Sequence, residues 1–322
     1  MTNSTILNKK VLITGGAGFI GSNIVDYLVS INHQNIVVLD NLETGFLKNI
    51  EQYLESGRIK FILGDIRNYN NCLQATKDCD IVLHQAALGS VPRSIEKPLE
   101  THATNVTGFI NMLDAAKTNR VKRFIYASSS SVYGDDLSLP KMEDKVRNPL
   151  SPYAVSKKTN ELYAAIFSNL YDMEIIGLRY FNVFGPKQNP LGPYAAVIPI
   201  FINKLLKNET CVIVGDGENK RDFTYVTNVV QANILAAVSE NKLVPGQVFN
   251  VAYGATETIN NLYKIIKKNL SSDLSPEYKS PRVGEIKNSF ANINKIKTLL
   301  HYHPQTTLND GILKAIEWYK KN

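Results

Sequence analysis

The sequence predicts an α/β fold, in which a doubly wound parallel sheet is accompanied by a smaller carboxyl-terminal α/β lobe. Short apolar runs alternate with helical patterns from the start of the chain, an order typical of a parallel sheet with helices on both faces. A glycine-rich turn also joins the first of these runs to the first helical pattern. We expect residues 1–180 to form the first domain and residues 181–322 mainly the second, with some later segments returning to the first.

The first turn predicts a dinucleotide-binding site of the Rossmann kind. Gly15, Gly18 and Gly21 follow a β-branched run at G-x-x-G-x-x-G spacing. The first glycine allows the turn, the second lets a pyrophosphate approach the backbone, and the third lets the helix pack against the strand. Phe19 and Ile20 begin the helix, whose N-terminus favours the negative charge of such a ligand.

The next two strands add an acidic residue each. Asp40 ends the apolar run 36–39, about 20 residues after the glycine turn, where a carboxylate can bind both hydroxyls of an adenosine ribose. Such an acid repels the 2′-phosphate of NADP and therefore favours NAD. Asn41 and Gly45 lie in the polar loop that follows. Asp65 and Ile66 follow the strand predicted over 59–64, and the spacing favours Asp65 as a helix N-cap over a contact with adenine.

Two later strands end in small or hydroxyl side chains. The strand predicted over 81–84 runs into Gln85, Ala86 and Ala87, which would let a ligand lie close to the backbone. We interpret His84 as a packed strand residue. The strand predicted over 124–127 ends in serines at 128–131, which serve either as backbone caps or as hydroxyls that face a substrate.

The next helix carries a tyrosine and a lysine on one face. Tyr153 and Lys157 are four residues apart, so their side chains project from adjacent turns. A nearby lysine lowers the pKa of a phenol by stabilising the phenolate, which suits a general base near neutral pH. A longer helix is predicted over 99–119, and Asn105 lies in the part that would pass near the sheet.

Composition excludes several classes of function. The formal charge of 36 − 29 = +7 suits anionic ligands, but the basic residues are scattered, so we expect no nucleic-acid binding. Cys72, Cys79 and Cys211 lack metal-ligand spacing, which predicts inert thiols in a reducing compartment and no metal. No segment approaches the roughly 18 apolar residues of a membrane helix. These observations predict a cytoplasmic protein.

Taken together, these motifs resemble the extended short-chain dehydrogenase/reductase family. The resemblance continues in later motifs that are similar to those of nucleotide-sugar enzymes, above all the UDP-hexose 4-epimerases. It rests on the glycine turn, Asp40, Asp65, the Ser129 region, the Tyr153–Lys157 pair, and residues 179–186, 215–217, 221–223 and 281–285.

The resemblance implies roles for individual residues. Tyr153 would be the catalytic base, Lys157 would orient the nicotinamide ribose, and Ser129 would supply the active hydroxyl, with Ser131 in reserve. The implied cofactor site is completed by Gln85, Ala86, Ala87 and Tyr180. The implied UDP-sugar contacts are Gly89, Ser90, Val91, Arg93, Ser129, Ser130, Ser131, Asn182, Val197, Arg221, Arg282, Glu285 and Ser289.

Two positions distinguish the relatives. The 4,6-dehydratases of this family carry an Asp-Glu pair directly after the active hydroxyl residue, where this chain has Ser130 and Ser131. Ser289 stands where a tyrosine restricts some epimerases to unacetylated sugars. We therefore expect an NAD-dependent interconversion of UDP-N-acetylglucosamine and UDP-N-acetylgalactosamine through a 4-keto intermediate, with UDP-glucose and UDP-galactose as further substrates.

Two alternatives remain at this point. One is a UDP-uronic acid 4-epimerase or another nucleotide-sugar epimerase, which would need an additional cation or hydroxyl facing C6. The other is a non-catalytic NAD-sensing regulator, although such a protein would not need a serine, a tyrosine and a lysine together. The resemblance also implies a homodimer, in which helices 99–119 and 153–170 of two chains form a four-helix bundle.

Overall fold

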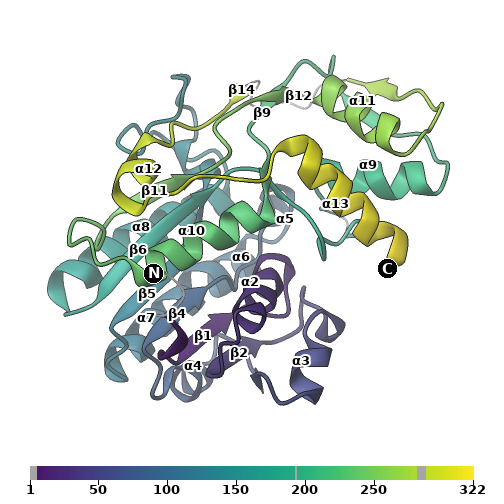
Figure 1. Ribbon diagram of the computed structural model, residues 1–322. Coiled ribbons are helices and arrows are strands. Elements are labelled where there is room, and N and C mark those ends of the chain that lie inside the picture. Colours follow the sequence, from purple (N-terminus) through teal and green to yellow (C-terminus); the bar gives the residue numbers. More distant parts are fainter. Residues whose placement is uncertain (1–5, 193, 281–287) are drawn as a thin grey trace.

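The computed structural model describes residues 6–192, 194–280 and 288–322 (Figure 1). Its main sheet has seven strands in the order β11-β6-β5-β4-β1-β2-β3, and every neighbouring pair is parallel. The predicted fold class is therefore confirmed. The strands are β1 (Val11–Thr14), β2 (Ile36–Asp40), β3 (Lys60–Leu63), β4 (Ile81–His84), β5 (Arg123–Ser129), β6 (Glu174–Tyr180) and β11 (Val248–Val251).

Alternate side chains of the buried strands point into two separate cores. In β1, Val11 and Ile13 join the core beneath α2, α10 and α12, whereas Leu12 joins the core beneath α4, α7 and α8. The helices and short turns of this part are α2 (Phe19–Ser30), η1 (Leu47–Asn49), α3 (Glu51–Glu55), α4 (Tyr69–Thr76), α5 (Val91–Glu96), α6 (Pro98–His102), α7 (Gly108–Thr118), η3 (Ser130–Tyr133), α8 (Pro152–Leu170), α10 (Val226–Val238) and α12 (Asn294–Leu300).

The helix predicted over 99–119 is interrupted. A wide π-helical turn, η2 (Ala103–Thr107), lies between α6 and α7 and carries Asn105. The Asn105 side chain accepts a hydrogen bond from the Leu88 amide (2.8 Å) and donates to the Leu88 carbonyl (3.1 Å) and to Ser156 Oγ (3.2 Å). The irregular turn thus fixes the loop after β4 against α8, which the apolar period could not reveal.

The smaller lobe has its own core. Phe184, Phe201, Tyr263 and Ile312 are buried between α9, α11 and α13, at the upper right of Figure 1. Its elements are β7 (Val183–Phe184), α9 (Val197–Leu206), β8 (Val212–Val214), β9 (Lys220–Arg221), β10 (Thr224–Tyr225), β12 (Glu257–Thr258), α11 (Ile259–Asn269), β13 (Glu277–Lys279), β14 (Asn288–Ser289) and α13 (Leu308–Lys321). Both α10 and β11 come after residue 181 but pack in the main sheet domain.

The order of the strands determines where a ligand can bind. The chain leaves β1 toward β2 and β3 on one side, then crosses to β4, β5 and β6 on the other. Loops that follow β1 and β4 therefore diverge at the carboxyl edge of the sheet and leave a crevice between them. Among the described residues, no helix is both long enough and apolar enough to cross a bilayer.

Candidate functional site

A cleft of about 820 Å³ lies at this carboxyl edge. One wall comes from the ends of β1, β2, β4, β5 and β6 and from the start of α8, and the other from residues 182–192, 194 and 195 of the smaller lobe. Residues that the sequence places far apart, such as Gly15, Ser129 and Tyr153, line the same cavity. The cleft therefore brings together residues of the predicted site.

The glycine turn has no room for side chains. Gly15 has a φ of +68°, and a Cβ there would stand 2.7 Å from the Ala86 nitrogen. A Cβ on Gly21 would stand 2.1 Å from the Gly15 carbonyl oxygen. Gly18 precedes α2 without a side-chain cap, so the first amides of this helix are available to an anionic ligand.

Asp40 lies where the adenosine ribose is expected. Its carboxylate lines the cleft and accepts hydrogen bonds from the amides of Ala17 (2.9 Å) and Leu42 (2.8 Å). Burial raises the pKa of Asp40, and these backbone hydrogen bonds oppose that rise. Each oxygen keeps lone pairs for a ribose hydroxyl. Gly45 packs on the backbone of Ala17, where a Cβ would be 2.9 Å from the carbonyl carbon, and so supports the turn from behind.

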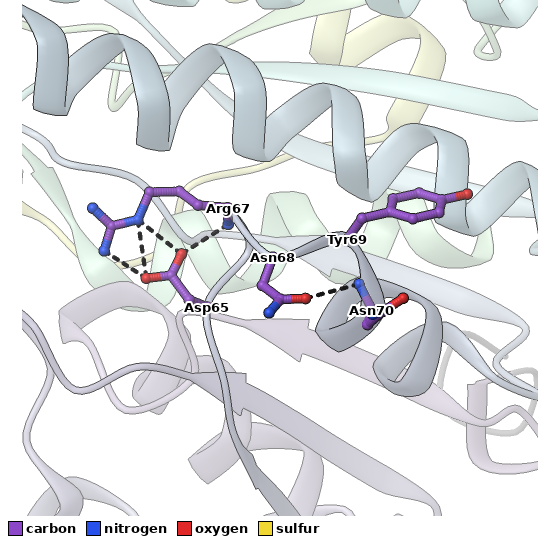
Figure 2. A pocket seen from close by; sticks show the side chains of 5 residues that line it. All are labelled: Asp65, Arg67, Asn68, Tyr69 and Asn70. Atoms are coloured by element: carbon purple, nitrogen blue, oxygen red, sulfur yellow. Dashed lines mark hydrogen bonds and ion pairs between the residues drawn. The ribbon is translucent and has the colours of Figure 1, made fainter.

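Asp65 is not the helix cap that the spacing favoured. Asn68 caps α4 by accepting from the amides of Asn70 and Asn71. Figure 2 shows Asp65 paired instead with Arg67, whose Nε lies 2.9 and 3.0 Å from the two carboxylate oxygens, in a shallow depression that also includes Tyr69. Burial raises the pKa of Asp65, but the hydrogen bonds from Arg67 and Asn41 outweigh it and lower the pKa to about 2. Ile66, by contrast, lines the main cleft.

The centre of the cleft is built by β4 and β6. Gln85, Ala86 and Ala87 line it, and the Tyr180 hydroxyl donates to Gln85 Oε1 (3.0 Å). Asn233 of α10 donates to the Tyr180 oxygen (2.9 Å) and accepts from Gln85 Nε2 (3.0 Å). Sequence reasoning missed Asn233, because nothing in a helical pattern shows that a polar residue faces a strand end 148 residues away.

Tyr153, Lys157 and Ser129 lie together in the cleft. The α8 helix begins after Ser151, whose Oγ accepts from the Ala154 amide (3.1 Å), and this cap places Tyr153 in the first turn. Lys157 follows one turn later, with Nζ 2.8 Å from the Ala127 carbonyl oxygen and 5.9 Å from the centroid of the Tyr153 ring.

The expected lowering of the Tyr153 pKa does not appear in this geometry. Burial raises the pKa of Tyr153, and its hydrogen bond with Ser129 offsets only part of that rise. The Lys157 ammonium is held by the Ala127 carbonyl and not by the phenol oxygen. Burial also lowers the pKa of Lys157 to about 8, although Glu161 opposes this.

His84 is a packed residue, as predicted. Burial lowers the pKa of His84 to about 3, so its ring is neutral, and Thr14 Oγ1 lies 2.8 Å from its Nδ1.

The two candidate hydroxyls are distinguished by geometry. Strand β5 ends at Ser129, and Ser131 belongs to the η3 turn, so the argument that both project from one strand face does not hold. Ser131 donates to Ser129 through both its amide (3.1 Å) and its Oγ (3.0 Å). Because Ser129 is the one that contacts Tyr153, Ser131 is placed as its support.

The predicted sugar-side residues divide into three groups. Gly89, Ser90, Val91, Arg93, Ser130, Ser131 and Asn182 line the cleft. Within the part of the chain that the structure describes, Val197, Arg221 and Ser289 lie outside its wall, and Ser289 pairs with Arg221 between β14 and β9. Arg282 and Glu285 fall in segment 281–287, outside the described residues. Tyr194 also lines the cleft, although the sequence did not indicate it. The Arg93 guanidinium carbon lies 5.2 Å from the centroid of the Tyr194 ring.

Comparison with known proteins decides the family. Residues 11–252 match the family model described as "NAD dependent epimerase/dehydratase family". The chain belongs to this NAD-dependent epimerase/dehydratase family. The resemblance inferred from the motifs and the NAD cofactor are both confirmed.

The relatives match over nearly their whole length. A putative UDP-glucose 4-epimerase of Methanocaldococcus jannaschii is 39% identical over 314 residues, 97% of this chain and 99% of that protein. The UDP-N-acetylglucosamine 4-epimerase of Methanobrevibacter ruminantium, solved with UDP-N-acetylmuramic acid, is 39% identical, with a TM-score of 0.92 over 97% of this chain and 98% of its own. The UDP-glucose 4-epimerase of Thermotoga maritima, solved with UDP-glucose, is 34% identical, with a TM-score of 0.90 over 97% and 98%.

The glycine turn yields a direct test of the cofactor site. We expect Gly21→Ala to remove most of the NAD that copurifies with the protein, because the new Cβ would overlap the Gly15 carbonyl. NAD released by denaturing the purified protein measures this. Gly57→Ala is the control, because Gly57 has a positive φ (+67°) that strains the substitution but has open space around it, so the new Cβ meets no neighbouring atom. Equal NAD content in both variants would contradict the assignment.

Proposed function

We propose that the protein is an NAD-dependent 4-epimerase of UDP-hexoses. The observation that carries this proposal is the meeting of Ser129, Tyr153 and Lys157 in one cleft with the glycine turn. The family includes dehydratases, and the resemblance places their Asp-Glu pair at Ser130 and Ser131, which cannot protonate a leaving hydroxyl or remove a C5 proton. An epimerase needs neither group.

The reaction requires only that a proton leave the 4-hydroxyl oxygen, that a hydride leave C4, and that both return. Tyr153 takes the proton of the 4-hydroxyl, directly or through Ser129, which contacts it. NAD, when bound, supplies the reversible acceptance of the C4 hydride. The 4-keto sugar then turns about its pyrophosphate linkage and presents its other face, and Tyr153 returns the proton to the new hydroxyl. Lys157 places a positive charge 5.9 Å from the centroid of the Tyr153 ring, which favours the phenolate but does not outweigh the effect of burial on the Tyr153 pKa.

The UDP portion is proposed to supply affinity without reacting. Asn182 lines the cleft and donates to the Asp222 carbonyl (3.0 Å), and we place it with Arg221 and Arg282 around this portion. Arginines suit a pyrophosphate because their charge-assisted hydrogen bonds are strong and directional. Binding energy from groups that do not react leaves the hexose free to rotate.

We propose that N-acetylated hexoses are the preferred substrates. Support comes from Ser289, a small residue that pairs with Arg221 on the adjacent strand and so lies next to the proposed UDP contacts. A serine leaves space for a 2-acetamido group where a tyrosine would fill it. The UDP-N-acetylglucosamine 4-epimerase among the similar structures is consistent with this preference.

The proposed base is tested by Tyr153→Phe. We expect kcat to fall by about 100-fold or more, since the general base is removed while the ring is kept. UDP binding, measured by calorimetry on the same preparation, should change little because Tyr153 acts at the sugar. Full activity of the variant would overturn the assignment.

The sugar preference is tested by Ser289→Tyr. We expect kcat/KM to fall by about 10- to 200-fold for UDP-N-acetylglucosamine, while UDP-glucose is affected much less, because the new ring competes only with the acetamido group. The assay compares both sugars and UDP-glucuronic acid without added NAD. An equal loss on the acetylated and unacetylated sugars would argue against a gate at this position. Wild-type turnover of the uronate alone would favour the UDP-uronic acid epimerase.

We also propose that two copies of the chain pair through α8. Its outer face presents Val155, Leu162, Ile166 and Leu170, which are 50 to 68% exposed and lie at helical spacing. The helix packs on α6 and α7. Two such helical surfaces, one from each copy, would together form a four-helix bundle. An apolar stripe of this kind is a typical oligomer interface.

Light scattering tests this pairing. We expect Ile166→Glu to convert a dimer into monomers, because it places two charges in the apolar contact. Leu243→Glu is the control, since Leu243 is also exposed (67%) but follows α10 on another part of the surface. A wild-type monomer, or a dimer that survives Ile166→Glu, would contradict the proposed interface.

A further inference from the structure

A buried ion pair lies one turn beyond Lys157 on the same face of α8. Arg179 of β6 binds Glu161 of α8 through two parallel hydrogen bonds, Nε to Oε1 and Nη2 to Oε2, both 2.8 Å long. Arg179 is 3% exposed and Glu161 6%. A bidentate arginine–carboxylate contact fixes both partners in position and orientation.

The same carboxylate holds the end of β5. Ser128 Oγ donates to Glu161 Oε1 at 2.6 Å. Ser128 lies between Ala127, whose carbonyl accepts the Lys157 ammonium, and Ser129, the proposed active hydroxyl. Glu161 is therefore one hydrogen bond from the short backbone segment that positions both groups.

Arg179 extends the contact to the turn after β5. Its Nη1 donates to the Tyr133 hydroxyl (3.1 Å) at the end of η3 and to the Glu143 carbonyl (2.9 Å). The Tyr133 hydroxyl donates in turn to Asn250 Oδ1 (2.6 Å) on β11. One continuous set of hydrogen bonds thus joins α8, β5, β6, η3 and β11 beneath the cleft.

We propose that Glu161 and Arg179 are positioning residues, which hold the Lys157 ammonium and the Ser129 hydroxyl in register with Tyr153. This inference rests on the proposed function, because it assigns the pair to the epimerase base. A buried ion pair is a costly way to stabilise a core, since an apolar pair of similar volume does so as well or better. Here the pair instead places a negative charge near Lys157 and fixes the end of β5 through Ser128.

The charge of Glu161 acts on Lys157. The two residues are one helical turn apart, and Glu161 raises the pKa of Lys157 against the effect of burial. The other titratable groups around this point are His84 on β4, Tyr126 on β5, Tyr153 on α8 and Arg179 on β6. His84 is neutral, and burial raises the pKa values of Tyr126 and Tyr153, so neither phenol supplies charge at neutral pH.

Glu161→Gln tests the charge with little change in shape. Loss of the carboxylate lowers the pKa of Lys157, and Arg179, left unpaired, adds to that effect. Lys157 then loses its proton at lower pH, so the alkaline limb of the kcat profile should move down by about one pH unit or more. We expect kcat at pH 8 to fall about fivefold or more, while KM for the UDP-sugar changes less than about twofold.

Glu174→Gln is the matched control. Glu174 at the start of β6 pairs with Arg123 at the start of β5, the opposite end of β6 from Arg179, with Nη2 and Oε2 2.6 Å apart. A purely structural pair would lower stability or the active fraction without moving the pH profile. An unshifted alkaline limb in Glu161→Gln would therefore overturn the proposal.

A readout without turnover separates this inference from the proposed function. NMR of lysine Nζ groups, with Lys157 assigned by its loss in Lys157→Met, gives the titration of Lys157 in the NAD-bound protein directly. We expect its midpoint to be lower in Glu161→Gln than in the wild type and unchanged in Glu174→Gln. A wild type without epimerase activity would refute the proposed function, whereas an unchanged Lys157 midpoint would refute the role of the pair.

Discussion

The parallel direction of the seven strands is the constraint on which the site depends. Because all of them end at one edge, residues from β1, β2, β4, β5 and β6 meet there although they span 165 positions of the chain, from Gly15 to Tyr180. The turn at Gly15 must approach Ala86 within a distance that no side chain permits, and this contact brings the ends of β1 and β4 together. This contact therefore shapes the end of the cleft where we propose that the cofactor binds.

The chemistry depends on a second, electrostatic constraint. Tyr153 lies where burial raises its pKa, so the positive charge of Lys157 has to be kept close to it. Burial acts against Lys157 as well and brings its pKa to about 8, so its ammonium group begins to lose its proton just above neutral pH. The carboxylate of Glu161 opposes this loss of charge, and the bidentate contact with Arg179 keeps that carboxylate in place. In our proposal, this chain of buried charges, which reaches from β6 to the cleft, positions the base.

Much of this could be predicted from the sequence, and the limits have physical causes. The strands and the glycine turn are local features, and the apolar runs together with Gly15, Gly18, Gly21 and Asp40 sufficed to predict the fold and NAD. The interruption near Asn105 escaped prediction because no residue type in this stretch signals the wider i→i+5 turn. Asp65 was misplaced because Asn68 competes for the same cap. Glu161, Arg179 and Asn233 were missed because their roles come from partners distant in sequence, and the sugar-side predictions at Arg282 and Glu285 lie beyond the described residues.

The central claim is that the C4 hydrogen leaves the sugar as hydride and returns to the same carbon, while Tyr153 handles only the hydroxyl proton. It is tested most directly by incubating the purified protein, without added NAD, with UDP-N-acetylglucosamine deuterated at C4 and following the product by proton NMR. Our account predicts that the C4 epimer forms with its deuterium retained. Loss of the deuterium to water during epimerisation would contradict it, because the hydrogen would then have left as a proton.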